Sequence, residues 1–240
     1  MILLPDGKSL QGNDLLEEVV SDAAIQQANR EFLAINQDQL VPSDQPSLCV
    51  FQGEEGAADW EAVAGLYVGS EDATTCVILA SRCPVTRRAY VVHHDESACH
   101  MQPEEILSHL EQMQQPELYL VGGFAEGSGV SESTCRSLLT LLHHQTRKQV
   151  QLRLACIWTA NRDPDTGGPC ARNLSLHCES GAPSPAGFAD RGPALPRRFA
   201  YQHCKQRSGL VSIAEADQPG VIRLPGFRVS LGDNHCMYLY

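Results

Sequence analysis

The stretch "TTCVILASRCPVTRRAYVVHHD", residues 74–95, holds two apolar runs joined by a short polar segment. Both runs are rich in the β-branched and aromatic residues that favour strands. Because Cys83, Pro84 and neighbouring polar residues separate the runs, we expect an antiparallel pair of strands. Cys76 then lies near the start of the first strand and His93 near the end of the second. The hairpin therefore brings a thiol and an imidazole together at one end.

The segments around this hairpin predict helices and further short strands. Asn13 or Asp14 can cap a helix whose apolar residues, from Leu15 to Phe32, recur about every 3.6 positions. Two more helices are predicted, one from Pro103 and one capped by Ser131 or Ser133. The other predicted strands are "LCVFQG" (48–53), "AVAGLYVGS" (62–70), "ELYLVGGF" (117–124), "VQLRLACIWTA" (150–160), "NLSLHCES" (173–180), "GLVSIAEA" (209–216) and "VIRLPGFRV" (221–229).

Strands outnumber helices in this pattern, and most neighbouring strands are expected to run antiparallel. The sequence thus predicts one α+β domain over residues 1–240, with a mostly antiparallel, sandwich-like sheet flanked by helices. Residues 163–196 are rich in Gly, Pro, Ser and Ala, which predicts a long, poorly ordered excursion. The phosphate-binding glycine motifs of nucleotide folds are absent from the sequence.

Composition narrows the class of partner. The chain of 240 residues has a formal net charge of -11, which argues against nucleic acid or an anionic membrane and favours a cationic ligand. We expect no secretion signal at the N-terminus, and no apolar run reaches the roughly 18 residues that span a bilayer. The ten cysteines include no C-x-x-C pair and are expected to be reduced thiols. These features predict a protein of the cytoplasm or nucleus.

Cys76 and His93 are candidates for chemistry because a thiol needs a neighbouring base to become the attacking thiolate. The alternative is a buried core thiol beside an edge histidine. With ten cysteines and nine histidines in the chain, one such pair can arise by chance. The residue types alone leave both interpretations open.

Metal binding is the second candidate chemistry, because several residues within "HHDESACH" (93–100) are of types that ligate zinc. Their spacing matches no closed structural zinc pattern, and no second cluster completes a tetrahedral set. We therefore predict no metal and no other cofactor. The residues concerned are His93, His94, Asp95, Cys99 and His100.

Four segments carry a family resemblance: "GSEDATTC" (69–76), "HHD" (93–95), "LYLVGGF" (118–124) and "FADRGP" (188–193). In the same order, they resemble segments of the protein N-terminal asparagine amidohydrolases, which deamidate N-terminal asparagine to aspartate in the N-degron pathway. The layout is also similar to that of chemotaxis-receptor glutamine deamidases and deamidating toxins. Those enzymes have a hydroxyl residue six positions before the cysteine and a histidine seventeen after it, offsets that fall here on Ser70 and His93.

The resemblance implies a residue set. Cys76 would be the nucleophile and His93 the acid and base, while Ser70 would orient His93 or bind the amide. A carboxylate is expected to bind the substrate's α-ammonium group, with Asp72 and Asp95 as candidates and Glu71 as a weaker one. The full set of expected substrate-binding residues is Asp72, Thr75, Asp95, Gly122, Gly123 and Phe124.

The implied function is thiol-dependent deamidation of N-terminal asparagine in proteins and peptides, with other N-degron components as partners. Two alternatives are a deamidase of internal glutamine side chains and a non-catalytic module that binds N-terminal residues. The chain ends at Tyr240, shortly after the last shared strands, so a shortened C-terminal portion is also expected.

Overall fold

The computed structural model of the chain describes residues 1–95, 103–163, 165–192, 195–202, 211–212, 227–230 and 236–239. Its centre is the expected hairpin, formed by β6 (Val77–Cys83) and β7 (Arg88–His94). The two strands pair antiparallel, from Val77 opposite His94 to Cys83 opposite Arg88. The predicted pairing is therefore confirmed.

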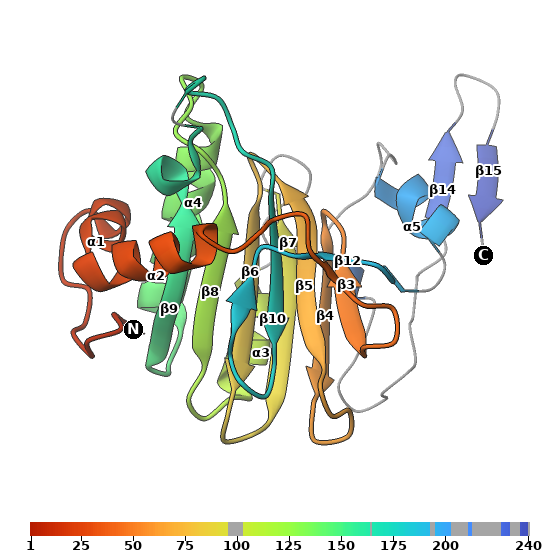
Figure 1. Cartoon of the computed structure of the whole chain (residues 1–240), viewed down its shortest axis with the longest axis horizontal. Helices are drawn as coiled ribbons and strands as arrows, with labels where there is room; N and C mark the ends of the chain where they lie inside the picture. Colours follow the sequence, from red (N-terminus) through yellow and green to blue (C-terminus); the bar gives the residue numbers. More distant parts are fainter. Residues whose placement is uncertain are drawn as a thin grey trace.

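The hairpin lies inside a seven-stranded sheet of order β1-β9-β8-β6-β7-β4-β13 (Figure 1). β6 runs antiparallel to both of its neighbours, whereas β8 and β9 are parallel and are connected through α4. The other strands of this sheet are β1 (Ile2–Leu3), β4 (Glu54–Asp59), β8 (Glu117–Gly122), β9 (Val150–Ile157) and β13 (Val211–Ser212).

A second, four-stranded sheet of order β11-β10-β5-β3 covers one face of the first. Apolar side chains from both sheets form one buried cluster between them, including Val68 of β5, Leu174 of β10 and Ile78 of β6. The strands are β3 (Ser47–Val50), β5 (Tyr67–Ala73), β10 (Arg172–His177) and β11 (Pro183–Ser184). Two short pairs complete the strands: β2 (Leu40–Val41) with β12 (Gly187–Phe188), and β14 (Phe227–Ser230) with β15 (Cys236–Leu239).

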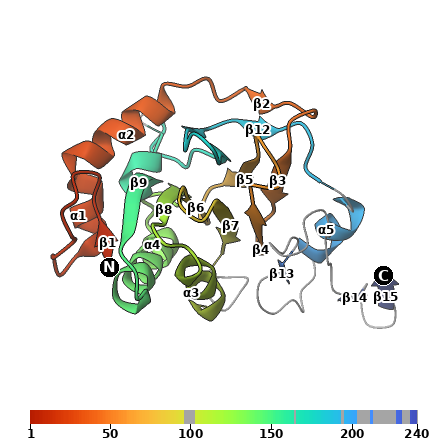
Figure 2. The ribbon, with the colours of Figure 1, turned by 90° about the horizontal axis from the view of Figure 1, so that it is seen from below.

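Helices cover the opposite face of the large sheet. Figure 2 shows α3 (Pro103–Glu111) and α4 (Val130–Thr140) on this face, with β3 and β5 on the other. α4 is continued by a π-helical turn, η1 (Leu141–Gln145), and a 3-10 turn, η2 (Trp158–Asn161), follows β9. The α+β class and the sandwich-like arrangement are thus confirmed. In the described part of the chain, no helix is long and apolar enough to span a membrane.

Two details of the helices differ from expectation. The single N-terminal helix is in fact two, α1 (Leu15–Ser21) and α2 (Ala23–Leu33), because Asp22 is extended and its carboxylate caps α2 by accepting from the N–H groups of Ala24 and Ile25. The N-cap of α4 is Gly129, in the left-handed conformation, and not Ser131 or Ser133. Ser131 instead donates its N–H to Glu126.

Residues 163–196 contain more regular structure than the composition indicates. The strand predicted at 173–180 is β10, which pairs antiparallel with β5, and β11 and β12 follow it. β4 has the sequence "EEGAAD" and was not predicted, since its residue types do not favour strands. Much of the strands expected at 209–216 and 221–229 lies outside the described residues.

A buried ion pair attaches α5 (Leu195–Gln202) to the strands. The Arg198 and Glu54 side chains are 0% and 1% exposed, with Nη2 2.7 Å from Oε2. Arg198 also donates from Nη2 to the carbonyl of Cys49 at 2.6 Å and stacks over the Phe51 ring. Glu54 in turn accepts from the N–H of Phe51 at 2.7 Å. Each charge is therefore satisfied at several atoms in a site without water access.

Removing one partner of this pair leaves an uncompensated buried charge. We expect Glu54→Ala to lower the free energy of unfolding by about 3–5 kcal/mol. Urea denaturation with Glu61→Ala as the matched control measures this, because the Glu61–Arg87 pair is exposed and is worth under about 1 kcal/mol. Equal losses for the two variants would contradict the assignment of Glu54 as the anchor of α5.

Candidate functional site

The imidazole of His93 is oriented by a hydroxyl from the other sheet. Ser70 Oγ lies 2.7 Å from His93 Nδ1 and donates to the carbonyl oxygen of Val50 at 2.6 Å. A serine hydroxyl has one proton, so toward His93 it acts as acceptor. In the neutral ring, Nδ1 then carries the proton and Nε2 the lone pair. Ser70 is 0% exposed and His93 3%, so water competes little for these bonds.

Cys76 immediately precedes β6, at the strand end where Val77 pairs with His94 and Ile78 with His93. The structure thus brings Cys76 and His93 to the same end of the hairpin. The Cys76 side chain is 7% exposed. Its carbonyl oxygen accepts from the N–H of Gly123 at 2.7 Å, which fixes the backbone at the thiol.

The glycine pair after β8 allows this close approach. Gly122 has φ +112, and a Cβ there would lie 2.3 Å from the carbonyl oxygen of Cys76. Gly123 has φ +58, and a Cβ there would meet the Sγ of Cys135 at 3.0 Å. Both backbones are in the region that favours glycine. Substrate contacts are predicted at both glycines, and in the structure Gly122 is packed against the Cys76 backbone and Gly123 against the core.

Burial keeps three of the other described thiols in the protonated form. It raises the pKa of Cys135 and of Cys178 to about 12 and that of Cys156 to about 11, so these groups stay protonated. At Cys83 burial also acts to raise the pKa, but hydrogen bonds from Thr86 and Gln115 outweigh it and lower the value. Cys83 is fully buried at the end of β6 that is distant from His93.

His93 lines a cavity of about 220 Å³ whose walls come from four parts of the chain. Phe51 and Gln52 follow β3, and the acidic residues Glu71 and Asp72 lie on β5. Arg191 belongs to the "FADRGP" segment, and Phe199 is on α5. The described lining residues are Phe51, Gln52, Glu71, Asp72, His93, Arg191 and Phe199. Cys76 is not among them, although it lies at the same strand end.

A β-bulge brings both acidic residues of β5 into this cavity. Ser70 pairs with Leu174 and Ala73 with Arg172, so Glu71 and Asp72 together oppose the single residue Asn173. In a regular strand, consecutive side chains point to opposite faces, and a bulge redirects one of them. Asp72 has φ 60, and its N–H donates to Asn173 Oδ1 at 2.9 Å, which stabilises this left-handed backbone.

The two carboxylates differ in their partners. Glu71 is 9% exposed, accepts from the N–H of Phe188 at 2.8 Å and pairs with Arg191 at 2.5 Å, so its charge is balanced. Asp72 is exposed, and its carboxylate has no hydrogen-bond or ion-pair partner among the described residues. The cavity thus presents one unbalanced carboxylate to a ligand.

Of the other predicted substrate-binding residues, Asp95 is connected to this cavity through a lining residue. Asp95 is buried and accepts from the Nε2 of Gln52, which itself lines the cavity. Thr75 and Phe124 are half-buried and are not among the described lining residues. Sequence reasoning did not identify Phe51, Gln52, Asn173 or Phe199, whose positions follow from pairing and packing between distant segments.

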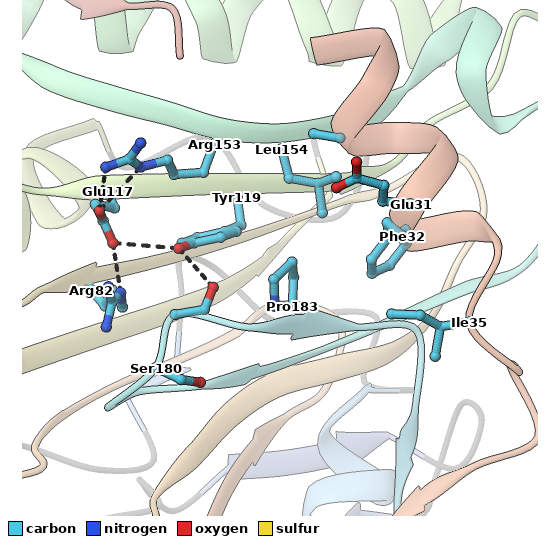
Figure 3. Close-up of a pocket in the computed structure, with 12 residues that line it drawn as sticks. Glu31, Phe32, Ile35, Arg82, Glu117, Tyr119, Arg153, Leu154, Ser180 and Pro183 are labelled. Atoms are coloured by element: carbon cyan, nitrogen blue, oxygen red, sulfur yellow. Dashed lines mark hydrogen bonds and ion pairs between the residues drawn. The ribbon is translucent and has the colours of Figure 1, made fainter. Parts of the chain in front are cut away.

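A larger cavity of about 520 Å³ lies at the opposite ends of β6 and β8 (Figure 3). Three of its charged groups satisfy one another: Glu117 accepts from Arg82 at 2.6 Å and from Arg153 at 2.6 Å. Tyr119 donates to the carbonyl of Gly181 at 3.1 Å. No cysteine or histidine is among its described lining residues, so its chemistry does not match that of the His93 cavity.

The described residues contain no group of three or more His, Cys, Asp or Glu side chains placed to hold a metal ion. His93 Nδ1 is instead engaged by Ser70. Cys99 and His100 of the metal hypothesis lie outside the described residues.

A buried thiol and an oriented imidazole lie at one strand end, beside a small acidic cavity. Thiol and imidazole are the residue types that thiol-dependent hydrolases use. The family model for protein N-terminal asparagine amidohydrolases matches residues 37–226, and the chain belongs to this family. It is accordingly an amidohydrolase, and family membership implies deamidation of N-terminal asparagine in protein substrates. A comparison with curated proteins finds no match.

The glycine contact at Cys76 gives a test of how the thiol is positioned. We expect Gly122→Ala to move the Cys76 backbone and to lower the free energy of unfolding by about 1–3 kcal/mol, because both the positive φ and the 2.3 Å contact oppose a Cβ. Thermal unfolding and the alkylation rate of Cys76 measure the change. Gly127→Ala is the matched control, since nothing lies within 4 Å of its added Cβ. Equal behaviour of the two variants would contradict the positioning role.

Proposed function

We propose that this chain hydrolyses the side-chain amide of N-terminal asparagine through Cys76, His93 and Ser70, and that Asp72 binds the α-ammonium group of the substrate. The observation that carries the proposal is the bulge at Asn173, which puts an unbalanced carboxylate in the same cavity as the imidazole. A protein with formal net charge -11 also attracts a cationic N-terminus.

The chemistry uses the tautomer that Ser70 favours. His93 Nε2 takes the proton of Cys76, and the thiolate attacks the carboxamide carbon to form a tetrahedral oxyanion. His93 then donates the proton to the departing nitrogen, the C–N bond breaks and ammonia leaves. Water attacks the resulting thioester while His93 Nε2 accepts its proton, and cleavage of the S–C bond restores Cys76 and releases the peptide with an N-terminal aspartate.

Selectivity for asparagine follows from distance. Glutamine is longer by one methylene, a difference worth about 10- to 200-fold in a pocket. If Asp72 holds the ammonium group while the carboxamide must reach Cys76, the distance between these two contacts suits the side chain of asparagine and not the longer side chain of glutamine. We also propose that the enzyme works in the cytoplasm or nucleus, with other components of the N-degron pathway as partners.

A peptide assay tests the reaction. We expect the purified chain to release ammonia from an Asn-initiated peptide about 10- to 200-fold faster than from its Gln-initiated counterpart. Cys76→Ser should abolish release, because a serine hydroxyl ionises far too weakly to replace the thiolate. Mass spectrometry of the product identifies the new aspartate. Binding without release would support a binding module, and a preference for internal glutamine would support a receptor-type deamidase.

The ammonium contact is tested separately. Acetylating the N-terminus of the peptide should abolish turnover. Asp72→Asn should lower kcat/KM by an amount that corresponds to about 2 kcal/mol of lost transition-state stabilisation. This value is at the low end for a lost charge partner, because Asp72 is exposed. Asp38→Asn, at another exposed aspartate, should leave kcat/KM unchanged. The alkylation rate of Cys76 should stay the same in both variants. Equal turnover of free and acetylated peptides would contradict the proposed contact between Asp72 and the ammonium group.

A further inference from the structure

Two adjacent cavities lie at the end of β6 that is remote from the candidate functional site. The first, of about 520 Å³, is the cavity in Figure 3, and the second has a volume of about 480 Å³. Glu117 and Arg153 line both cavities. Arg82, in the lining of the first, is five residues along β6 from Val77, which corresponds to about 17 Å. A ligand bound here therefore lies outside the candidate functional site.

Two arginines flank one glutamate where the cavities meet. Glu117 accepts from Arg82 through Oε2 and from Arg153 through Oε1, each at 2.6 Å. One negative charge thus lies between two positive ones. Nη2 of Arg82 and Nη1 of Arg153 have no hydrogen-bond partner among the described residues. Guanidinium groups with donors to spare are suited to a second carboxylate, supplied by a ligand.

Arg82 has a structural role that Arg153 does not share. It donates from Nη1 to the carbonyl oxygens of Cys178 at 2.7 Å and Glu179 at 2.9 Å. A Cβ on Gly181 would lie 2.5 Å from its guanidinium carbon. These contacts hold the turn between β10 and β11 against β6, and the shared glutamate already balances the charge of Arg82. The second positive charge, at Arg153, is not needed for this arrangement.

A β-bulge places Arg153 beside the glutamate. Consecutive residues of β8, Leu118 and Tyr119, pair with Leu152 and Leu154 of β9. Arg153 is therefore an extra residue in a parallel pair of strands, where bulges are rare. Its side chain is 43% exposed. Bulges often redirect a side chain toward a functional site, which favours a binding role for this arginine.

The walls of the two cavities differ in chemistry. The first is apolar on its α2 side, where Phe32 and Ile35 lie (Figure 3). The second is lined by four glutamines, and three of these are exposed and have no partner for their side-chain amides among the described residues. A glutamine amide can both donate to and accept from a peptide backbone. The four glutamines are Gln114, Gln115, Gln149 and Gln151.

Two further charged residues line these cavities. Lys148 adds a positive charge to the second. Glu31 lines the first, but it is exposed and accepts from Gln27 Nε2 at 2.6 Å. Figure 3 shows Glu31 on α2, away from Arg82 and Arg153. Positive charge therefore predominates where the cavities meet, although the whole chain has a formal net charge of -11.

We propose that the two cavities form one groove that binds an extended acidic segment of a partner protein, with an aspartate or glutamate side chain of that segment at Arg153 and Arg82. An apolar side chain of the same segment packs against Phe32 and Ile35, and the glutamines bind its backbone. The groove continues through both cavities, so a peptide fills it better than a compact small anion. This inference does not depend on the proposed reaction.

Fluorescence anisotropy with a labelled peptide tests the groove. The probe is Leu-Glu-Leu-Glu-Leu-Glu with both ends blocked, so that no free N-terminus can enter the His93 cavity. We expect its Kd to be at least about 10-fold lower than that of the Leu-Gln counterpart. Arg153→Gln should raise the Kd about 10-fold, the low end for hydrogen bonds to a charged group because this arginine is half-exposed. Arg153→Lys, which keeps the charge, should raise it less.

Arg136→Gln is the matched control. Arg136 is 37% exposed at its side chain and is also ion-paired, but it lies on α4, so this change should leave the Kd of the probe unchanged. Cys76→Ser should bind the probe as tightly as the natural chain, which keeps this test independent of deamidation. Thermal unfolding of each variant separates lost binding from lost folding.

Three results would overturn the proposal. The first is an equal Kd for the Glu and Gln probes, and the second is an equal loss of binding in Arg153→Gln and Arg136→Gln. The third is displacement of the probe by N-acetylglutamate with the same Kd, which would assign the site to a small anion and not to a peptide. Weaker binding of the Glu probe at higher salt, with little change for the Gln probe, would support it.

Discussion

The Ser70 hydroxyl has one proton to donate, and the geometry of the site depends on where that proton goes. It goes to the carbonyl of Val50, the last residue of β3, at 2.6 Å. Since Ser70 belongs to the four-stranded sheet and His93 to the seven-stranded sheet, their contact joins the two layers where the cavity lies. The packing of the sandwich therefore brings Ser70 to Nδ1 of His93, and this contact favours the tautomer with the proton on Nδ1.

At the same end of the sandwich, the carboxylates differ in how deeply they are buried. Glu54 and Glu71 are buried, and each is paired with an arginine from the segment that follows β12. A buried carboxylate without a partner is costly, and in these pairs each negative charge is balanced by an arginine. Asp72 is exposed, and solvent stabilises its charge until a cation arrives. Neighbouring residues, Glu71 and Asp72, thus differ in that one carboxylate is buried and paired and the other is exposed.

The local sequence pattern was sufficient to predict the central hairpin, because the apolar runs on either side of the turn after Cys83 allow one pairing. The contact of Ser70 with His93 was anticipated from family spacing and not from the residues themselves. The bulge at Asn173 could not be predicted, since it depends on how a distant strand aligns with β5. Phe199 has no local signal for the same reason: Arg198 selects its position by reaching Glu54, 144 residues earlier in the chain.

The residues with positive φ at the site are held in that conformation by neighbouring contacts. Asp72 has a left-handed backbone that a non-glycine residue adopts at a cost, and the Asn173 carboxamide compensates with a hydrogen bond. Gly122 and Gly123 adopt similar angles without that cost, because they have no Cβ, and they hold the carbonyl of Cys76 on the opposite side of the hairpin end. Asp72 thus occupies a left-handed position that glycine would adopt at lower cost. This favours a role for the Asp72 side chain in binding over a role for its backbone in turning the chain.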